Sequence, residues 1–263
     1  MTVRYIKKKG GLMLRKLGLS LLSTIVVAGF LATSATPAAS ANDQLPDLAM
    51  ARLRSFSIEN TTDGRRLLRF STVIVNIGAG PFEVHGTRAS STDPWTAEQQ
   101  IYDDAGGFRL ARVGATFVWG GDGHNHWHVK DLERFDLQRL SDGSNVGISP
   151  KSGFCFGDSY QYNLGLPGAP QSKVYSGAGC APKKPAALSL RMGVSVGWGD
   201  IYTWRLPDQY IDISSLPDGS YRLLAAADTS NQFFESNETN NSTWVNLSIS
   251  GTTVTVLKRA PNP

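Results

Sequence analysis

Short apolar segments separated by turn residues run through the chain from residue 42 onward, and this feature constrains the fold most strongly. No long segment repeats its apolar residues at the 3.6-residue period of an amphipathic helix. Residues 67–77 are rich in Val, Ile and Phe on both faces, which is typical of a strand buried between two layers. Asp-Gly pairs at 63–64 and 142–143 favour tight turns. The pattern predicts an all-β fold, an antiparallel β-sandwich with long loops and little helix.

The expected strands share this alternation of apolar runs and turn residues. They cover residues 48–58 (one long strand or a pair), 67–77, 82–86, 99–103, 108–119, 124–137, 200–204, 209–213, 221–227 and 243–249, with a last hairpin closing through residues 250–251. The order of the strands within the sheets does not follow from these data.

The first 41 residues have the composition of a secretory signal. Residues 1–16 contain six basic residues and no acid, residues 17–31 are apolar, and Ala-Ser-Ala at 39–41 matches a cleavage site. A membrane anchor is the competing interpretation, but the apolar run is short for one. We therefore expect a signal peptide at residues 1–41 and a single exported domain at residues 42–263.

Without that segment, the charge balance changes sign. The whole chain has a net charge of +4, and its 26 basic and 22 acidic residues become 20 basic and 22 acidic residues. The alkaline character therefore belongs to the signal and gives no argument for nucleic acid or membrane partners. We expect neither nucleic acid binding nor stable membrane insertion after signal cleavage.

Cys155 and Cys180 are the only cysteines. An even count in an exported chain favours one disulfide. Two free thiols or metal ligands remain alternatives, although no CxxC spacing supports them. The segment between the cysteines is rich in Gly, Pro, Ser and Tyr, so we expect a stapled loop there.

Three of the four histidines, His124, His126 and His128, occupy alternate positions. Such positions share one face of a strand, and converging imidazoles bind copper, zinc, iron or nickel. A straight strand separates its first and fifth residues by about 13 Å, so the chain must bend to bring all three together. Residues 120–123, Gly-Gly-Asp-Gly, provide flexible backbone for that bend. The alternative is a polar strand face that carries histidines without a metal.

Three neutral imidazoles with an open coordination position make a catalytic type of metal site for zinc or copper. His85 is a possible fourth ligand, although a lone histidine is more often a surface or capping residue. Asp122 and Asp131 flank the cluster and either could orient an imidazole, or both could be solvated carboxylates at a strand end.

His124-Asn-His-Trp-His128 and the acidic-aromatic stretch that follows it to residue 137 resemble the copper-binding segment of the lysyl oxidase family. Residues 151–158, 193–213 and 235–241 are similar to three further segments of that family, in the same order. The resemblance covers residues 119–245, and together with the signal-like N-terminus it favours an exported member of bacterial type. The chain departs from the animal members in having one disulfide, and in having Gly-Gly-Asp-Gly where they carry additional histidine.

The resemblance implies that the three histidines hold copper and that Lys151 and Tyr202 form the cofactor lysine tyrosylquinone. Asp200, two residues before Tyr202, becomes a candidate general base. Without the resemblance, Lys151 is a solvated loop residue and Tyr202 a packed core residue.

The function implied is that of a secreted copper-dependent amine oxidase. It converts peptidyl lysine or other primary amines to aldehydes, consumes dioxygen, and releases hydrogen peroxide and ammonia. The alternative is an exported metal-binding β-sandwich, for copper handling or adhesion, without quinone chemistry.

Overall fold

The computed structural model describes residues 42–263 except 121–123 and 152. The predicted signal peptide at residues 1–41 lies outside the described residues, as does Asp122. Within the described part, no helix has the length and apolar character needed to cross a membrane.

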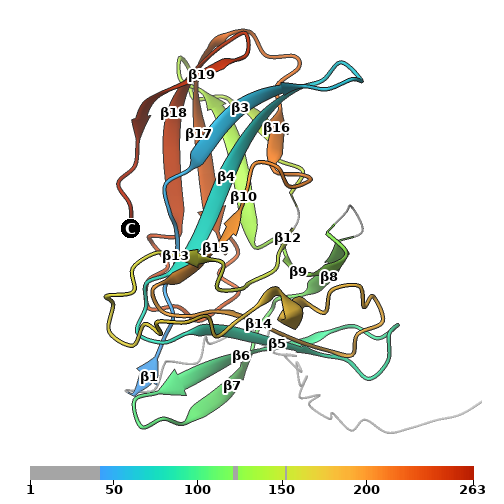
Figure 1. Ribbon diagram of the computed structural model, residues 1–263, viewed down its shortest axis with the longest axis vertical. Helices are drawn as coiled ribbons and strands as arrows, with labels where there is room; N and C mark the ends of the chain where they lie inside the picture. The colour runs from blue at the N-terminus through green and yellow to red at the C-terminus, as the bar shows by residue number, and fades with distance from the viewer. Residues whose placement is uncertain (1–41, 121–123, 152) are drawn as a thin grey trace, which may run out of the picture. The chain divides into compact units, whose positions relative to one another are not determined.

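Strands make up nearly all the regular structure of the described residues, with one short 3₁₀ helix (Figure 1). The first ten strands are β1 (Asp43–Gln44), β2 (Leu48–Met50), β3 (Arg54–Asn60), β4 (Arg66–Asn76), β5 (Phe82–Thr87), β6 (Thr96–Asp103), β7 (Phe108–Arg112), β8 (Phe117–Gly120), β9 (His126–Lys130) and β10 (Glu133–Arg139). The remaining elements are β11 (Asn145–Ile148), β12 (Gly153–Phe154), β13 (Tyr160–Gln161), η1 (Gly177–Cys180), β14 (Ser189–Val194), β15 (Trp198–Tyr202), β16 (Tyr210–Asp212), β17 (Gly219–Ala227), β18 (Ser242–Ser250) and β19 (Thr253–Arg259).

Two antiparallel layers form the sandwich. One is the sheet β11-β10-β17-β18-β19, and the other is built on β4, which pairs with β2, β3, β15 and β16. Phe70 of β4 meets Phe135 of β10 between the layers, with ring centroids 5.1 Å apart. β4 is buried along most of its length, as expected of a strand covered on both faces. Buried and more exposed residues alternate on β17 and β18, as expected of strands covered on one face. The all-β antiparallel prediction is confirmed.

Two smaller sheets complete the domain. One has the order β1-β6-β5-β14, with β7 on β6, and the other is β12-β9-β8 (Figure 1). The sequence predicted a continuous strand over residues 108–119 and another over residues 124–137, and the structure corrects both. β7 and β8 belong to different sheets, as do β9 and β10. Asp131 takes a left-handed backbone conformation with φ of 53°, and this ends β9.

The predicted disulfide joins Cys155 to Cys180, with the two Cα atoms 6.0 Å apart. The enclosed segment holds only β13 and η1, as expected of a stapled loop. Its position is fixed by Asp158, whose carboxylate accepts hydrogen bonds from the backbone amides of Val174, Tyr175 and Ser195. The disulfide therefore closes a loop that is also anchored internally.

Candidate metal centre and active site

The β8–β9 hairpin positions the histidines. His126 and His128 lie on one face of β9, and Trp127 points to the opposite face, where its ring packs 5.6 Å from that of Trp119. His124 lies in the turn before β9, so the three histidines do not share one strand as predicted. The required bend occurs at Asn125, which has a left-handed φ of 49°. Asparagine tolerates that conformation better than most residues.

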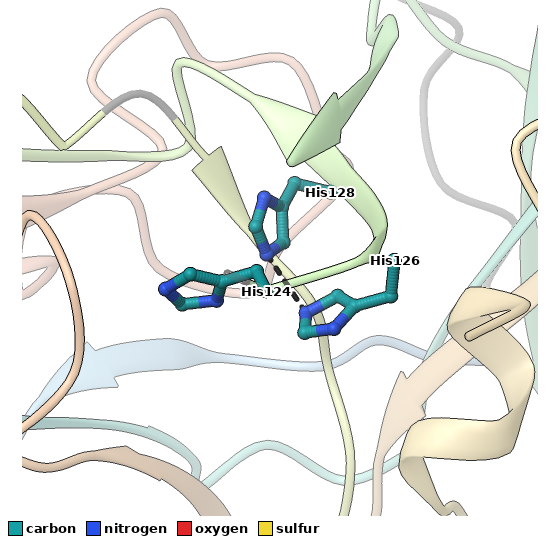
Figure 2. Close-up of side chains that lie close together, drawn as sticks. All are labelled: His124, His126 and His128. Atoms are coloured by element: carbon teal, nitrogen blue, oxygen red, sulfur yellow. Dashed lines mark hydrogen bonds between the residues drawn. The ribbon is translucent and has the colours of Figure 1, made fainter. Parts of the chain in front are cut away.

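The bend brings the three imidazoles together (Figure 2). One ring nitrogen from each of His124, His126 and His128 lies within 4.8 Å of the other two. The Nε2 atoms of His126 and His128 are 2.8 Å apart. Two metal–nitrogen bonds of about 2.0 Å at a right angle place their nitrogens about 2.8 Å apart, so this pair fits adjacent ligands of one ion. The donor set suits copper or zinc.

Two glycines make room for His128. A Cβ atom on Gly120 would lie 2.7 Å from Cε1 of His128 and 3.2 Å from Cβ of His124. A Cβ atom on Gly153 would lie 2.7 Å from Cβ of His128. These glycines therefore allow the ring to sit against the backbone of both neighbouring strands. The sequence pointed to Gly120 only as flexible backbone and gave no indication of Gly153.

Replacing Gly120 with alanine is expected to displace the imidazoles and to weaken copper binding by roughly 10–100-fold, the usual cost of disturbing the groups that orient metal ligands. The dissociation constant measured by competition with a chelator checks this. Gly114→Ala is the matched control, because no heavy atom lies within 4 Å of its added Cβ. Equal affinities for the two variants would contradict the role given to Gly120.

The other sequence candidates lie outside the cluster. His85 is on β5, and its Nε2 is 2.7 Å from Oε1 of Glu83, which Arg191 also contacts. Asp131 is exposed, and its carboxylate forms an ion pair with Lys130, 3.6 Å away at the surface. We therefore assign neither His85 nor Asp131 to the metal centre.

Lys151 and Tyr202, separated by 51 positions in the sequence, are neighbours in the fold. Nζ of Lys151 lies 4.1 Å from the centroid of the Tyr202 ring, and the lysine side chain is only 3% exposed. The backbone amide of Cys155 donates a hydrogen bond of 2.8 Å to the Tyr202 hydroxyl. The Tyr202 ring stacks on Phe154 at 4.1 Å and lies 6.0 Å from the ring of His124. The pair is therefore buried, oriented and close to the histidines.

Glu133, which lies beside Lys151, is another residue of this region that the sequence prediction missed. Its Oε1 lies 3.3 Å from Nζ of Lys151, and its side chain is fully buried. Burial raises the pKa of Glu133 to about 7, against the lowering effect of the Lys151 charge. The inward face of β10 also carries Phe135 and Leu137, so the two-residue period of this strand could have shown that Glu133 points inward.

Asp200 shares a face of β15 with Tyr202, because the two residues are two positions apart on this strand. Its residue is 8% exposed, and the Ser159 hydroxyl donates a hydrogen bond to its carboxylate. Burial raises the pKa of Asp200 to about 8, against the lowering effect of that hydrogen bond. A carboxyl group in such an environment can exchange a proton near neutral pH.

A cavity of about 310 Å³ lies beside the histidine cluster and the Tyr202 ring. His124, His126, Asp200 and Tyr202 line one part of it. The disulfide-closed loop lines another part, with Asp158, Ser159 and residues 175–177. The loop therefore helps to form the wall of the site.

The 235–241 segment has a different position. The Glu235 carboxylate accepts hydrogen bonds from the backbone amide of Leu48 and the side-chain amide of Asn241. Asn240 donates to Asp47 at 2.8 Å. The segment therefore attaches the β17–β18 connection to the start of β2, and its hydrogen bonds among the described residues serve the fold.

Comparisons with known proteins identify the family that this chain is similar to. The family model described as Lysyl oxidase matches residues 106–258. Lysyl oxidase homolog 3A of Danio rerio is 27% identical over 188 residues, 71% of this chain and 20% of that protein. Lysyl oxidase homolog 2 of Xenopus tropicalis is 26% identical over 182 residues, covering 69% and 18%. Lysyl oxidase homolog 3 of Homo sapiens is 26% identical over 189 residues, covering 71% and 19%. The chain thus spans about a fifth of the length of these curated relatives.

Proposed function

Because the chain belongs to the lysyl oxidase family, we propose that it is an exported copper-dependent amine oxidase. Its substrates are peptidyl lysine or other primary amines. The amine, dioxygen and water give the aldehyde, ammonia and hydrogen peroxide. The observation that carries the proposal is the position of Lys151 Nζ, 4.1 Å from the centroid of the Tyr202 ring, which itself lies 6.0 Å from the ring of His124.

His124, His126 and His128 hold the copper ion in this proposal, and Lys151 and Tyr202 form lysine tyrosylquinone. The copper and the quinone supply the redox chemistry, with electrons passing from the amine to dioxygen. The chain's own residues orient and desolvate the reacting groups. Phe154 and the Cys155 amide fix the plane of the Tyr202 ring. The buried position of the Tyr202 ring limits the access of bulk water to the groups that react there.

Asp200 is placed to remove the proton from the substrate carbon. It lines the same cavity as Tyr202, so a substrate held at the ring lies next to its carboxylate. A carboxylate accepts a proton only when it is ionised. Because the pKa of Asp200 is raised to about 8, ionisation is incomplete at pH 7 and increases through pH 8.

The direct functional test uses the full chain, loaded with copper under air. Hydrogen peroxide, ammonia and aldehyde are measured with lysine-containing peptides and with short alkylamines. Equal amounts of the three products and ping-pong kinetics are expected. A fully copper-loaded protein that yields no peroxide with any of these amines contradicts the proposal.

Replacing Asp200 with asparagine is expected to lower kcat by roughly 10²–10⁴-fold, the usual contribution of a positioned general base. In the unaltered protein, kcat should fall as the pH decreases below about 8, because protonation removes the base. Ser159→Ala removes a hydrogen bond that lowers the pKa of Asp200. The loss of kcat on the acid side of the pH profile should therefore begin at a higher pH in this variant. Peroxide release between pH 6 and 10 checks both results. An Asp200→Asn variant with the unaltered pH profile excludes Asp200 as the base.

The second candidate function is an exported metal-binding β-sandwich for copper handling or adhesion. The histidine cluster favours it, because metal binding does not itself require Lys151 or Tyr202. The buried Lys151–Tyr202 contact favours the oxidase, because a lysine in a purely structural metal module gains nothing from burial against a tyrosine ring.

A further inference from the structure

The ion pair of Glu133 and Lys151 is more deeply buried than its contacts explain. The two side chains are 0% and 3% exposed. Within the described part of the chain, neither carboxylate oxygen of Glu133 accepts a hydrogen bond of good geometry. Burying a carboxylate with so few hydrogen bonds lowers the stability of the folded state. Replacing a buried ion pair by apolar residues of similar size often leaves that stability unchanged or increases it. The pair therefore needs an explanation other than stability.

The geometry fixes the direction of the Lys151 amine. Nζ donates to the backbone oxygen of Gly153, lies 3.3 Å from Glu133 and faces the Tyr202 ring. Glu133 begins β10, where it is paired with Ala227 of β17. The carboxylate is thus held by the sheet, whereas Lys151 lies in the connection between β11 and β12. The carboxylate that contacts the amine is therefore carried by a paired strand.

We propose that Glu133 positions Nζ of Lys151 against the Tyr202 ring and accepts a proton that leaves Nζ when the Lys151–Tyr202 bond forms. This inference rests on the proposed function, because it concerns formation of the cofactor.

The protons and electrons balance. An ammonium group has no lone pair, and it loses two protons in becoming the cross-linked secondary amine. Glu133 takes one as a neutral carboxylic acid, and solvent takes the other. For a neutral amine, the overall conversion consumes one tyrosine ring and two molecules of dioxygen. It gives the cross-linked quinone, one water and one hydrogen peroxide, so dioxygen is the oxidant.

The burial of Glu133 favours this proton transfer. Moving one proton from Nζ to the carboxylate replaces two buried charges with two neutral groups, which an apolar environment favours. The pKa of Glu133, raised to about 7 by burial, agrees with a carboxyl group that can be protonated at neutral pH. Asp200, by contrast, is hydrogen-bonded by Ser159 and lines the open cavity, where it serves the substrate.

The test measures cofactor formation rather than catalysis. Full-length Glu133→Gln, Glu133→Asp and unaltered proteins are loaded with copper under air, and the Lys151–Tyr202 cross-linked peptide is quantified by mass spectrometry over time. Copper content and melting temperature report on folding. Glu59→Gln is the matched control, because it makes the same change in an exposed ion pair, with Arg69.

Glu133→Gln is expected to cross-link at least about tenfold more slowly, with copper content unchanged, and Glu133→Asp to fall between it and the unaltered protein. A packing role predicts the reverse order, because glutamine has the shape of glutamate and aspartate does not. Glutamine cross-linking as fast as aspartate, or as fast as the unaltered protein, overturns the inference. If Glu133→Gln does not fold, Glu133→Asp cross-linking at the unaltered rate overturns it. If the unaltered protein forms no cross-link, the proposed function fails first, and this inference fails with it.

Discussion

Replacing Lys151 with arginine is expected to abolish the quinone cofactor and amine oxidation while leaving copper bound. Arginine keeps a positive charge beside Glu133, but its guanidinium is not a nucleophile at neutral pH. Peroxide release should fall to background, a loss of at least about 10³-fold, because enzymatic accelerations are commonly 10⁶-fold or more. The cross-linked peptide should be absent.

The measurements separate the two roles of the site. Copper content by elemental analysis should match that of the unaltered protein, because Lys151 is not among the clustered histidine ligands. The melting temperature should fall by roughly 2–12 °C, because fitting a larger side chain into a buried position costs roughly 1–3 kcal/mol and each kcal/mol lowers the melting temperature of a domain of this size by about 2–4 °C. Loss of copper in parallel with the cofactor would count against separate roles for the lysine and the histidines.

Replacing His126 with alanine removes a metal ligand. Loss of a group that only orients a ligand lowers metal affinity by roughly 10–100-fold, so copper affinity should fall by more than that in this variant. The cross-link and the oxidase activity should then be lost as well. His126 is only partly buried, so its removal creates little empty space in the core. Copper affinity by chelator competition and the cross-linked peptide yield check the two effects.

His85→Ala provides the matched control for that variant. His85 is also partly buried, but it is paired with Glu83 rather than clustered with the other histidines. Copper affinity and cross-link yield should therefore remain at the unaltered level. A loss of copper affinity in His85→Ala similar to that in His126→Ala would restore His85 as a ligand and contradict the three-histidine site.

The sequence predicted the fold class because strand burial follows a short period that is visible in the residues themselves. It did not predict where strands break. At Asn125 and at Asp131, one residue in the left-handed backbone conformation turns the chain. The amino-acid sequence gives little indication of which residue takes that conformation. For the same reason, the sequence predicted that the histidines converge through a bend but did not locate the bend at Asn125.

The site was predicted unevenly for a different physical reason. The alternate spacing of the histidines is local information and indicated a metal cluster, although their convergence depends on the bend at Asn125. The contact between Lys151 and Tyr202 depends on how β12 and β15 are brought together, which no local pattern encodes, so only the family resemblance pointed to it. Glu133 was missed because a charged residue is usually solvent-exposed, although its place on the inward face follows from the two-residue period of β10.

The central claim is that Lys151 and Tyr202 become covalently joined. Peptide mapping of the copper-loaded, air-exposed protein tests it most directly. We expect a single species in which the Lys151 and Tyr202 peptides are linked, and its mass equals the sum of the two peptides plus one oxygen atom minus four hydrogen atoms. Copper-free protein kept without dioxygen should release the two peptides separately. If fully copper-loaded protein, after prolonged exposure to air, still releases both peptides unmodified, the account is wrong.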